Sequence, residues 1–148
     1  MSIRIQTEPF DPGREANAFL GETGGAGAAV TFTGLVRSDP RDPITALTLE
    51  CYPELAGNQL AAIEAQAIAR FGLLRVAVIH RYGRLLPKEP IVQVMTLAPH
   101  RQSAFAGAEY LMDYLKTDAP FWKSETTPGG SRWVEHKTAD DKAKTRWE

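Results

Sequence analysis

Several basic side chains stand where they could bind an anion and react with it. His100 and Arg101 come just before a helical pattern of apolar residues, and no acidic residue follows them until Glu109. The helix dipole disfavours cations at a helix N-terminus unless an anion lies between them and the free backbone N–H groups. The pair therefore favours a phosphate-like anion. The alternative is that both side chains simply point into solvent.

Lys123 lies in a short predicted strand between Trp122 and Ser124, with Phe121 and Glu125 on its own face. A lysine between an aromatic ring and a carboxylate can be desolvated and held in one geometry. Under those conditions a lysine can act as an acid, a base or a nucleophile. The alternative is an exposed strand lysine paired with Glu125.

Two further basic residues lie at the ends of predicted elements. Lys116 comes one helical turn after Met112, near the end of a predicted helix. The alternative to a functional role is that it only complements the helix dipole at that end. Arg37 closes a glycine-containing strand and begins a proline-bounded loop. That position suits an anion clamp, although an ordinary surface arginine could also occupy it.

The other candidate residues are predicted to be structural. Cys51 is expected to be a small core residue, and His80 a hydrogen-bonded histidine inside a covered strand, while His136 has no predicted role. The sequence has no phosphate-binding glycine loop, no Cys/His metal spacing and no Gly-x-Ser-x-Gly elbow. We therefore expect no bound metal and no cofactor.

The elements that must position these residues form a mixed α and β pattern. Alternating apolar residues predict strands at residues 3–6, 28–36 and 45–52. Two β-branched runs, apolar on nearly both faces, predict central strands covered by helices at residues 75–81 and 91–98. Apolar residues spaced three and four apart predict helices at residues 11–20, 53–71 and 103–116, the last with Phe105, Ala108, Met112 and Leu115 on its apolar face.

The C-terminal part of the chain predicts a hairpin and a tail. Residues 121–125 and 132–135 flank Pro128 and Gly129, the pattern of a type II turn between two strands. The charged segment from Thr138 is expected to be mobile up to Trp147.

Length and charge limit the class of protein. The chain has 148 residues, with 17 Lys plus Arg against 18 Asp plus Glu, and no linker or repeat, so we expect one domain over residues 1–148. Its single cysteine cannot form a disulfide within the chain, and we see no secretory signal, so we expect a cytoplasmic protein. The net charge of −1 argues against binding nucleic acid through bulk positive charge.

A series of short motifs, in this order and spacing, resembles the large, catalytic subunit of molybdopterin synthase. The resemblance covers the chain from about Ile3 to Trp147. The motifs are VTFTGLVR (30–37), LTLECY (47–52), VIHRYG (78–83), APHR (98–101), MDYLKT (112–117), APFWKSE (119–125) and RWVE (132–135).

The resemblance implies a fold, a reaction and partners. The fold would be an α+β, α/β hammerhead-like single domain with mixed and antiparallel sheets, about three helices and a C-terminal β-hairpin. The reaction would insert two sulfurs into cyclic pyranopterin monophosphate to form the dithiolene of molybdopterin. The sulfur would come from the C-terminal thiocarboxylate of a small ubiquitin-like subunit. A homodimer of large subunits would form the centre of a heterotetramer, and each neighbouring subunit could complete the other's pocket.

The resemblance also implies roles for individual residues. Lys116 and Lys123 would be catalytic, with Lys116 beside the thiocarboxylate and Lys123, oriented by Glu125, donating a proton. The residues implied to line the pocket for substrate and partner tail are Phe32, Arg37, His100, Arg101 and Met112. Lys137 stands near a position where related chains often have arginine, and we leave it unassigned.

Two other functions are compatible with the same residues. A non-catalytic adaptor could bind the tail of a ubiquitin-like protein, but it would not need a desolvated lysine flanked by aromatic residues. A phosphate-binding or RNA-binding module could use Arg37, His100 and Arg101, but it would need a wide basic surface and would lose affinity steeply with salt.

Overall fold

The strands form two four-stranded sheets in the computed structural model, which describes residues 2–117, 120–134 and 138–148. The strands of the first sheet, in spatial order, are β1 (Ile3–Gln6), β4 (Arg75–Arg81), β6 (Pro90–Ala98) and β2 (Ala28–Leu35). Those of the second are β5 (Gly83–Leu85), β3 (Ala46–Glu50), β7 (Trp122–Thr127) and β8 (Gly130–Val134). Only β1 and β4 pair in parallel among these strands. The predicted α+β class with mixed and antiparallel sheets is confirmed.

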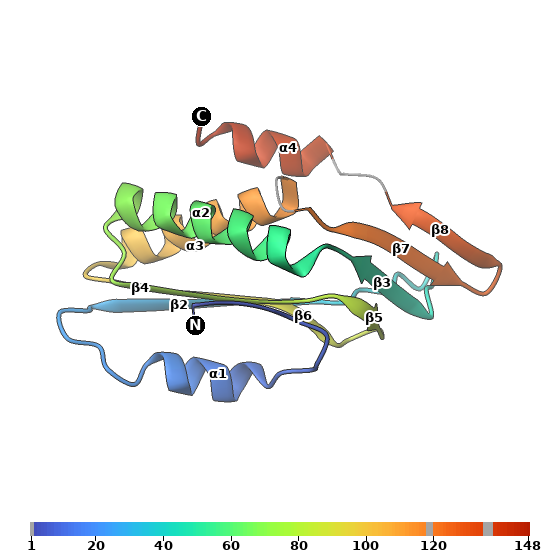
Figure 1. Ribbon diagram of the computed structural model, residues 1–148, viewed down its shortest axis with the longest axis horizontal. Coiled ribbons are helices and arrows are strands. Elements are labelled where there is room, and N and C mark those ends of the chain that lie inside the picture. Colours follow the sequence, from blue (N-terminus) through green and yellow to red (C-terminus); the bar gives the residue numbers. More distant parts are fainter. Residues whose placement is uncertain (1, 118–119, 135–137) are drawn as a thin grey trace.

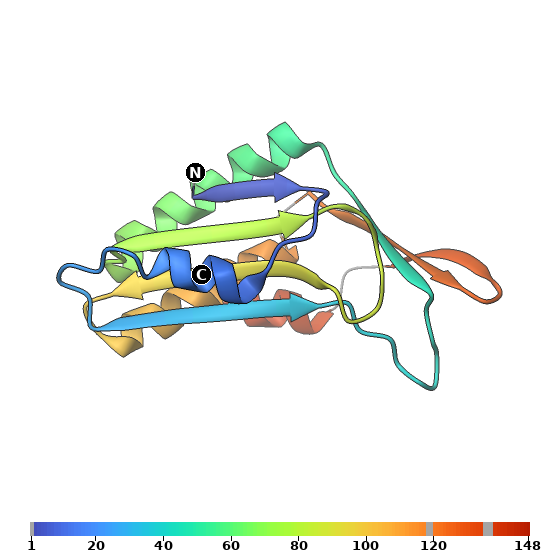
Figure 2. The same ribbon diagram turned by 90° about the horizontal axis from the view of Figure 1, so that it is seen from below.

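Helices cover both faces of the first sheet. Helices α2 (Pro53–Phe71) and α3 (Arg101–Thr117) lie on one face, and α1 (Pro12–Phe19) lies on the other (Figure 1). The second sheet extends beyond the end of the first, with the β7–β8 hairpin at its far edge (Figure 2). No helix in the described ranges is long and apolar enough to cross a membrane.

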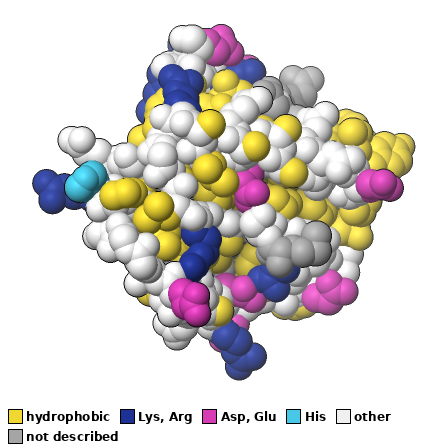
Figure 3. All heavy atoms as spheres, turned by 60° about the vertical axis from the view of Figure 1, so that its left-hand side comes forward, with side chains coloured by type: hydrophobic (Ala, Val, Ile, Leu, Met, Phe, Trp, Pro, Cys, Tyr) yellow, Lys and Arg dark blue, Asp and Glu magenta, His cyan; other side chains and the backbone are white. Residues whose placement is uncertain are grey.

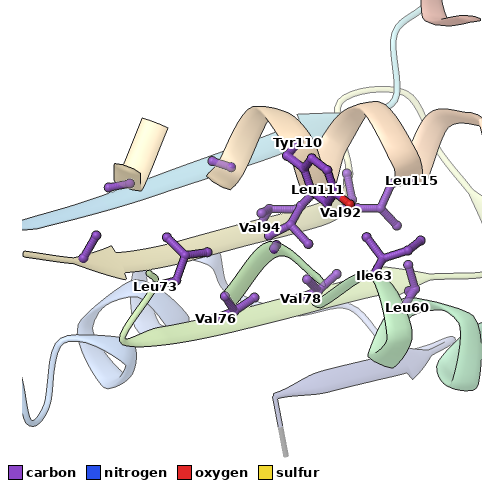
Figure 4. Packing of buried hydrophobic residues seen from close by; sticks show 14 residues of the cluster. Leu60, Ile63, Leu73, Val76, Val78, Val92, Val94, Tyr110, Leu111 and Leu115 are labelled. Carbon is purple, nitrogen blue, oxygen red and sulfur yellow. The ribbon is translucent and has the colours of Figure 1, made fainter. Parts of the chain in front are cut away.

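The main core lies between the first sheet and the α2–α3 layer. Figure 4 shows side chains from these two helices and from β4 and β6 converging on this layer. A smaller cluster of Phe19, Met95 and Leu97 lies on the α1 side. Strands β4 and β6 are therefore buried on both faces, which explains why each carries apolar residues on both faces.

Local signals determine several helix ends as predicted. The Asp11 carboxylate accepts hydrogen bonds from the backbone N–H groups of Gly13 and Arg14 at the start of α1. Helix α2 ends at Gly72, which has a φ of 64°, a conformation that glycine adopts without steric cost.

The predicted apolar face of α3 is wrong at one position. Phe105 is 59% exposed, whereas the neighbouring Ala104 is fully buried. Leu111 and Leu115, further along the helix, are also buried. The small residues Ala104 and Gly107 let the helix approach closely: a Cβ on Gly107 would lie 2.8 Å from Leu73 Cδ1. The buried stripe thus begins at Ala104 in place of Phe105, while Ala108 and Leu115 are buried as predicted.

The hairpin is confirmed, although its turn differs from the prediction. A type II turn would need a positive φ at Gly129, but the positive φ, 134°, falls on Gly130 instead. Strand β5 was not predicted, because it has only three residues and begins at a glycine with a φ of 88°.

The segment from Thr138, which we expected to be mobile, forms a helix. Helix α4 (Thr138–Thr145) packs on α3. Beyond it, the Trp147 ring contacts Phe71 and Tyr110, and its indole N–H donates to Asp113 Oδ2 at 2.6 Å. These contacts are long-range, so the local sequence does not reveal them.

Replacing Gly27 with alanine is expected to reduce the free energy of unfolding by about 1–3 kcal/mol. A Cβ at Gly27 would lie 2.3 Å from the backbone oxygen of Pro99, and no rotamer change relieves a backbone clash. Gly57→Ala is the matched control, because a Cβ there meets nothing within 4 Å and the helix should gain about 0.5–1 kcal/mol. Urea unfolding of both variants tests this, and equal stability would contradict it.

Candidate functional site

A cavity of about 600 Å³ opens where the two sheets meet the C-terminal end of α3. Its apolar wall includes Leu49 of β3 and Val92 of β6. Its aromatic wall includes Phe121 and Trp122 at the start of β7 and Trp133 of β8. The cavity is therefore built from segments that lie far apart in the chain.

Two lysines line this cavity from different elements. Lys116 is in the last turn of α3 and is exposed, whereas Lys123 is half-buried in β7. In the second sheet, Lys123 lies opposite Leu49 on one side and Val134 on the other, so two neighbouring strands position its backbone. The structure thus brings together the two lysines that the sequence analysis singled out.

His80 lines the same cavity, a role that the sequence analysis did not predict. Its Nδ1 lies 2.8 Å from the Arg81 carbonyl oxygen, so the prediction of a hydrogen-bonded core histidine is confirmed. Its ring stacks on Phe121, with centroids 3.9 Å apart and planes at 14°. Burial lowers the pKa of His80 to about 4, and the positive charges of Lys116 and Lys123 contribute to that lowering.

Phe32 and Met112, which the resemblance assigns to a substrate pocket, both line this cavity. Phe32 belongs to β2 and is 41% exposed, and Gly34 lies two residues further along the same strand. A Cβ at Gly34 would lie 2.7 Å from Val92 Cγ1, so the absence of a side chain there preserves room beside the cavity wall. Asp140 of α4 adds a carboxylate that the sequence analysis missed, because we predicted no helix at that position.

The other predicted pocket residues lie elsewhere in this chain. Arg37 is exposed beyond the end of β2 and is not among the described residues that line the cavity. His100 and Arg101 are exposed at the opposite end of α3 from Lys116. At about 1.5 Å per helical residue, Arg101 and Lys116 are separated by roughly 22 Å along the helix axis. One copy of the chain therefore does not bring this pair to its own cavity.

Glu125 has a different partner from the one predicted. Its Oε1 lies 3.0 Å from Arg132 Nε, and Arg132 also reaches Asp42 at 2.8 Å. Both hydrogen bonds raise the pKa of Arg132. Glu125 and Arg132 are directly opposite each other on β7 and β8, where paired side chains lie about 5 Å apart. Lys123 is two residues away from Glu125 along β7, which is a longer separation. The predicted pairing with Lys123 is thus replaced by this cross-strand ion pair.

The remaining candidates are Cys51, His136 and Lys137. Cys51 is half-buried, and burial raises the pKa of its thiol, which leaves it less reactive. His136 and Lys137 lie outside the described residues.

Acid should destabilise the protein through His80. Above pH 6.5 the ring is neutral in both the folded and the unfolded chain, so His80 does not reduce the free energy of unfolding there. As the pH falls toward about 4, the ring binds a proton in the unfolded chain before it does so in the folded chain. The free energy of unfolding then falls by up to about 3 kcal/mol. Denaturant unfolding at several pH values should show a weaker acid dependence in His80→Phe than in the wild type. An identical dependence would contradict this prediction.

The fold and the cavity define the class of protein. It is a single α+β domain whose mainly apolar cavity carries two lysines, an arrangement suited to binding and reacting with an anionic ligand.

Comparison with known proteins identifies the family. The family model of the MoaE protein matches residues 5–118. The molybdopterin synthase catalytic subunit of Cereibacter sphaeroides is 52% identical over 147 residues, which cover 99% of this chain and 100% of that protein. The chain therefore belongs to the MoaE family, the catalytic subunits of molybdopterin synthase, which are enzymes of molybdenum cofactor biosynthesis.

Solved structures agree with this assignment. The molybdopterin biosynthesis MoaE protein from Burkholderia ambifaria MC40-6 superimposes with a TM-score of 0.83 at 47% identity, covering 99% of this chain and 97% of that one. A protein-protein complex of subunits 1 and 2 of the molybdopterin-converting factor from Helicobacter pylori 26695 shares the fold, with a TM-score of 0.78 at 19% identity and coverage of 93% and 92%.

Proposed function

We propose that this chain transfers sulfur to cyclic pyranopterin monophosphate and so forms the dithiolene of molybdopterin. The sulfur donor is the C-terminal thiocarboxylate of a small ubiquitin-like subunit. The observation that carries the proposal is the convergence of Lys116 and Lys123 on one cavity in a chain of the MoaE family.

The charges of the reactants explain why two lysines are needed. A pterin phosphate and a thiocarboxylate are both anions, so they repel each other when they approach. Two ammonium groups on the wall of a mainly apolar cavity offset that repulsion. A thiocarboxylate is already ionised at neutral pH, so the enzyme has to position the nucleophile and move protons. We assign Lys116 to the thiocarboxylate and Lys123 to proton donation.

A second copy of the chain supplies the remaining cations. His100 and Arg101 are exposed at the far end of α3 from Lys116, so they are available to a neighbouring subunit's cavity. We propose that a homodimer places this pair, and Arg37, against bound phosphate, with one small subunit at each end of a heterotetramer. The single cysteine suits the reducing cytoplasm, where we place the complex.

The RNA-binding alternative fits the surface less well. On the face drawn in Figure 3, basic side chains are separated by acidic and hydrophobic ones and do not form a wide basic patch. The adaptor alternative does not account for two lysines on the wall of one cavity.

A single-turnover assay tests the proposal. The chain is mixed with cyclic pyranopterin monophosphate and a thiocarboxylated small subunit, and molybdopterin is detected as its fluorescent oxidation product. We expect product only when all three components are present. Binding of the small subunit without any product would instead support the adaptor.

A further inference from the structure

We propose that His80 is a positioning residue for sulfur transfer: its neutral imidazole presents Nε2 to the cavity as a hydrogen-bond acceptor that orients the Lys116 ammonium. This inference rests on the proposed function and adds to it a residue outside the lysine pair. His80 reaches the cavity from β4, in the first sheet, whereas Lys123 belongs to the second.

Hydrogen bonding determines which ring nitrogen is available. Nδ1 lies 2.8 Å from the Arg81 carbonyl oxygen, and a carbonyl oxygen can only accept a hydrogen bond. Nδ1 therefore carries the proton, and in a neutral ring Nε2 is left with a lone pair and no hydrogen. His80 is 9% exposed and lines the cavity. Nε2 is therefore the ring atom that can accept a hydrogen bond from a group in the cavity.

Packing holds the ring in one orientation. The imidazole stacks on Phe121, two residues before Lys123, with planes at 14°. Its backbone pairs with Ile5 on one side and with Val92 on the other, and Val92 also lines the cavity. A ring fixed by two strands and a stacked aromatic side chain can hold a lysine in place at little entropic cost.

The charges around the cavity favour a neutral ring. Among the residues that the structure describes, the charged groups that line the cavity with His80 are the cations Lys116 and Lys123 and the carboxylate Asp140. The pKa of His80 is lowered first by burial, then by the charge of Lys116 and less by that of Lys123. A protonated ring would repel the two ammonium groups, whereas a neutral acceptor can bind one of them. Pairing with β3 and β8 holds the backbone of Lys123 on both sides, whereas Lys116 lies in the exposed last turn of α3, so we assign Lys116 to Nε2.

Two variants separate positioning from structure. His80→Phe keeps an aromatic ring on Phe121 but removes both ring nitrogens, and His80→Gln restores an amide oxygen that can accept a hydrogen bond. We expect His80→Phe to lower the single-turnover rate about 10- to 100-fold, the range for a hydrogen bond to a charged group, with unchanged affinity for the small subunit. His80→Gln should recover most of that rate. Equal rates in His80→Phe and wild type, or a His80→Gln variant as slow as His80→Phe, would overturn the proposal.

Histidine spectra test His80 independently of activity. In ¹⁵N-histidine-labelled protein, His80 should carry its proton on Nδ1 at neutral pH, and its Nε2 resonance should shift in Lys116→Met but not in Lys142→Ala. Lys142 is an exposed residue of α4 outside the described cavity wall. A proton on Nε2, or no shift in Lys116→Met, would overturn the assignment. Absence of product with the wild-type chain would overturn the proposed function, and the spectra would still decide the role of His80.

Discussion

Replacing Lys123 with alanine is expected to lower the single-turnover rate of molybdopterin formation by at least about 100-fold, the lower range for loss of a general acid or base. The lysine is half-buried in β7, and pairing with β3 and β8 on either side holds it at the cavity wall. The rate is measured by rapid quench and fluorescence of the oxidised product. Near-normal turnover would contradict proton donation by Lys123.

Lys116→Ala should lower the same rate by a similar factor and should also weaken binding of the thiocarboxylated tail. Lys116 is exposed at the cavity, so its ammonium acts mainly as the positive charge that receives an anion. Lys142→Ala is the matched control, because it removes one exposed helical lysine outside the described cavity wall. Comparable losses in the control and in Lys116→Ala would show that net charge, and not position, sets the rate.

Truncation of Leu111 to alanine should reduce the free energy of unfolding by about 3 kcal/mol. Leu111 is 2% exposed in α3, in the same cluster as Val94 and Ile63 (Figure 4). Removal of its branched end leaves a void between the helix layer and the first sheet, and close-packed neighbours refill such a void only in part.

Leu55→Ala provides the control for Leu111→Ala. Leu55 is 45% exposed on α2, so the same truncation should cost well under about 1 kcal/mol. Denaturant unfolding with a common slope compares the two variants. Equal losses would show that the α2–α3 layer is not the main source of stability.

The sequence could indicate the two lysines, but only the tertiary structure shows that they line the same cavity. The sequence analysis named both lysines from their neighbours and from their place in predicted elements. It could not show that they share a cavity, because that depends on pairing of β7 with β3, more than 70 positions earlier in the chain. It assigned Glu125 to Lys123, yet the register of β7 and β8 places Arg132 directly opposite Glu125.

By itself, the sequence determined the local features of this protein. Period and end signals located the strands and helices, including the cap at Asp11 and the end of α2 at Gly72, because these depend on neighbouring residues. Only the tertiary structure decided which faces are buried and which side chains meet, as Phe105 and His80 show. Sheet register and helix packing are long-range, and a shift of one residue in strand register moves every side chain of the strand to the opposite face.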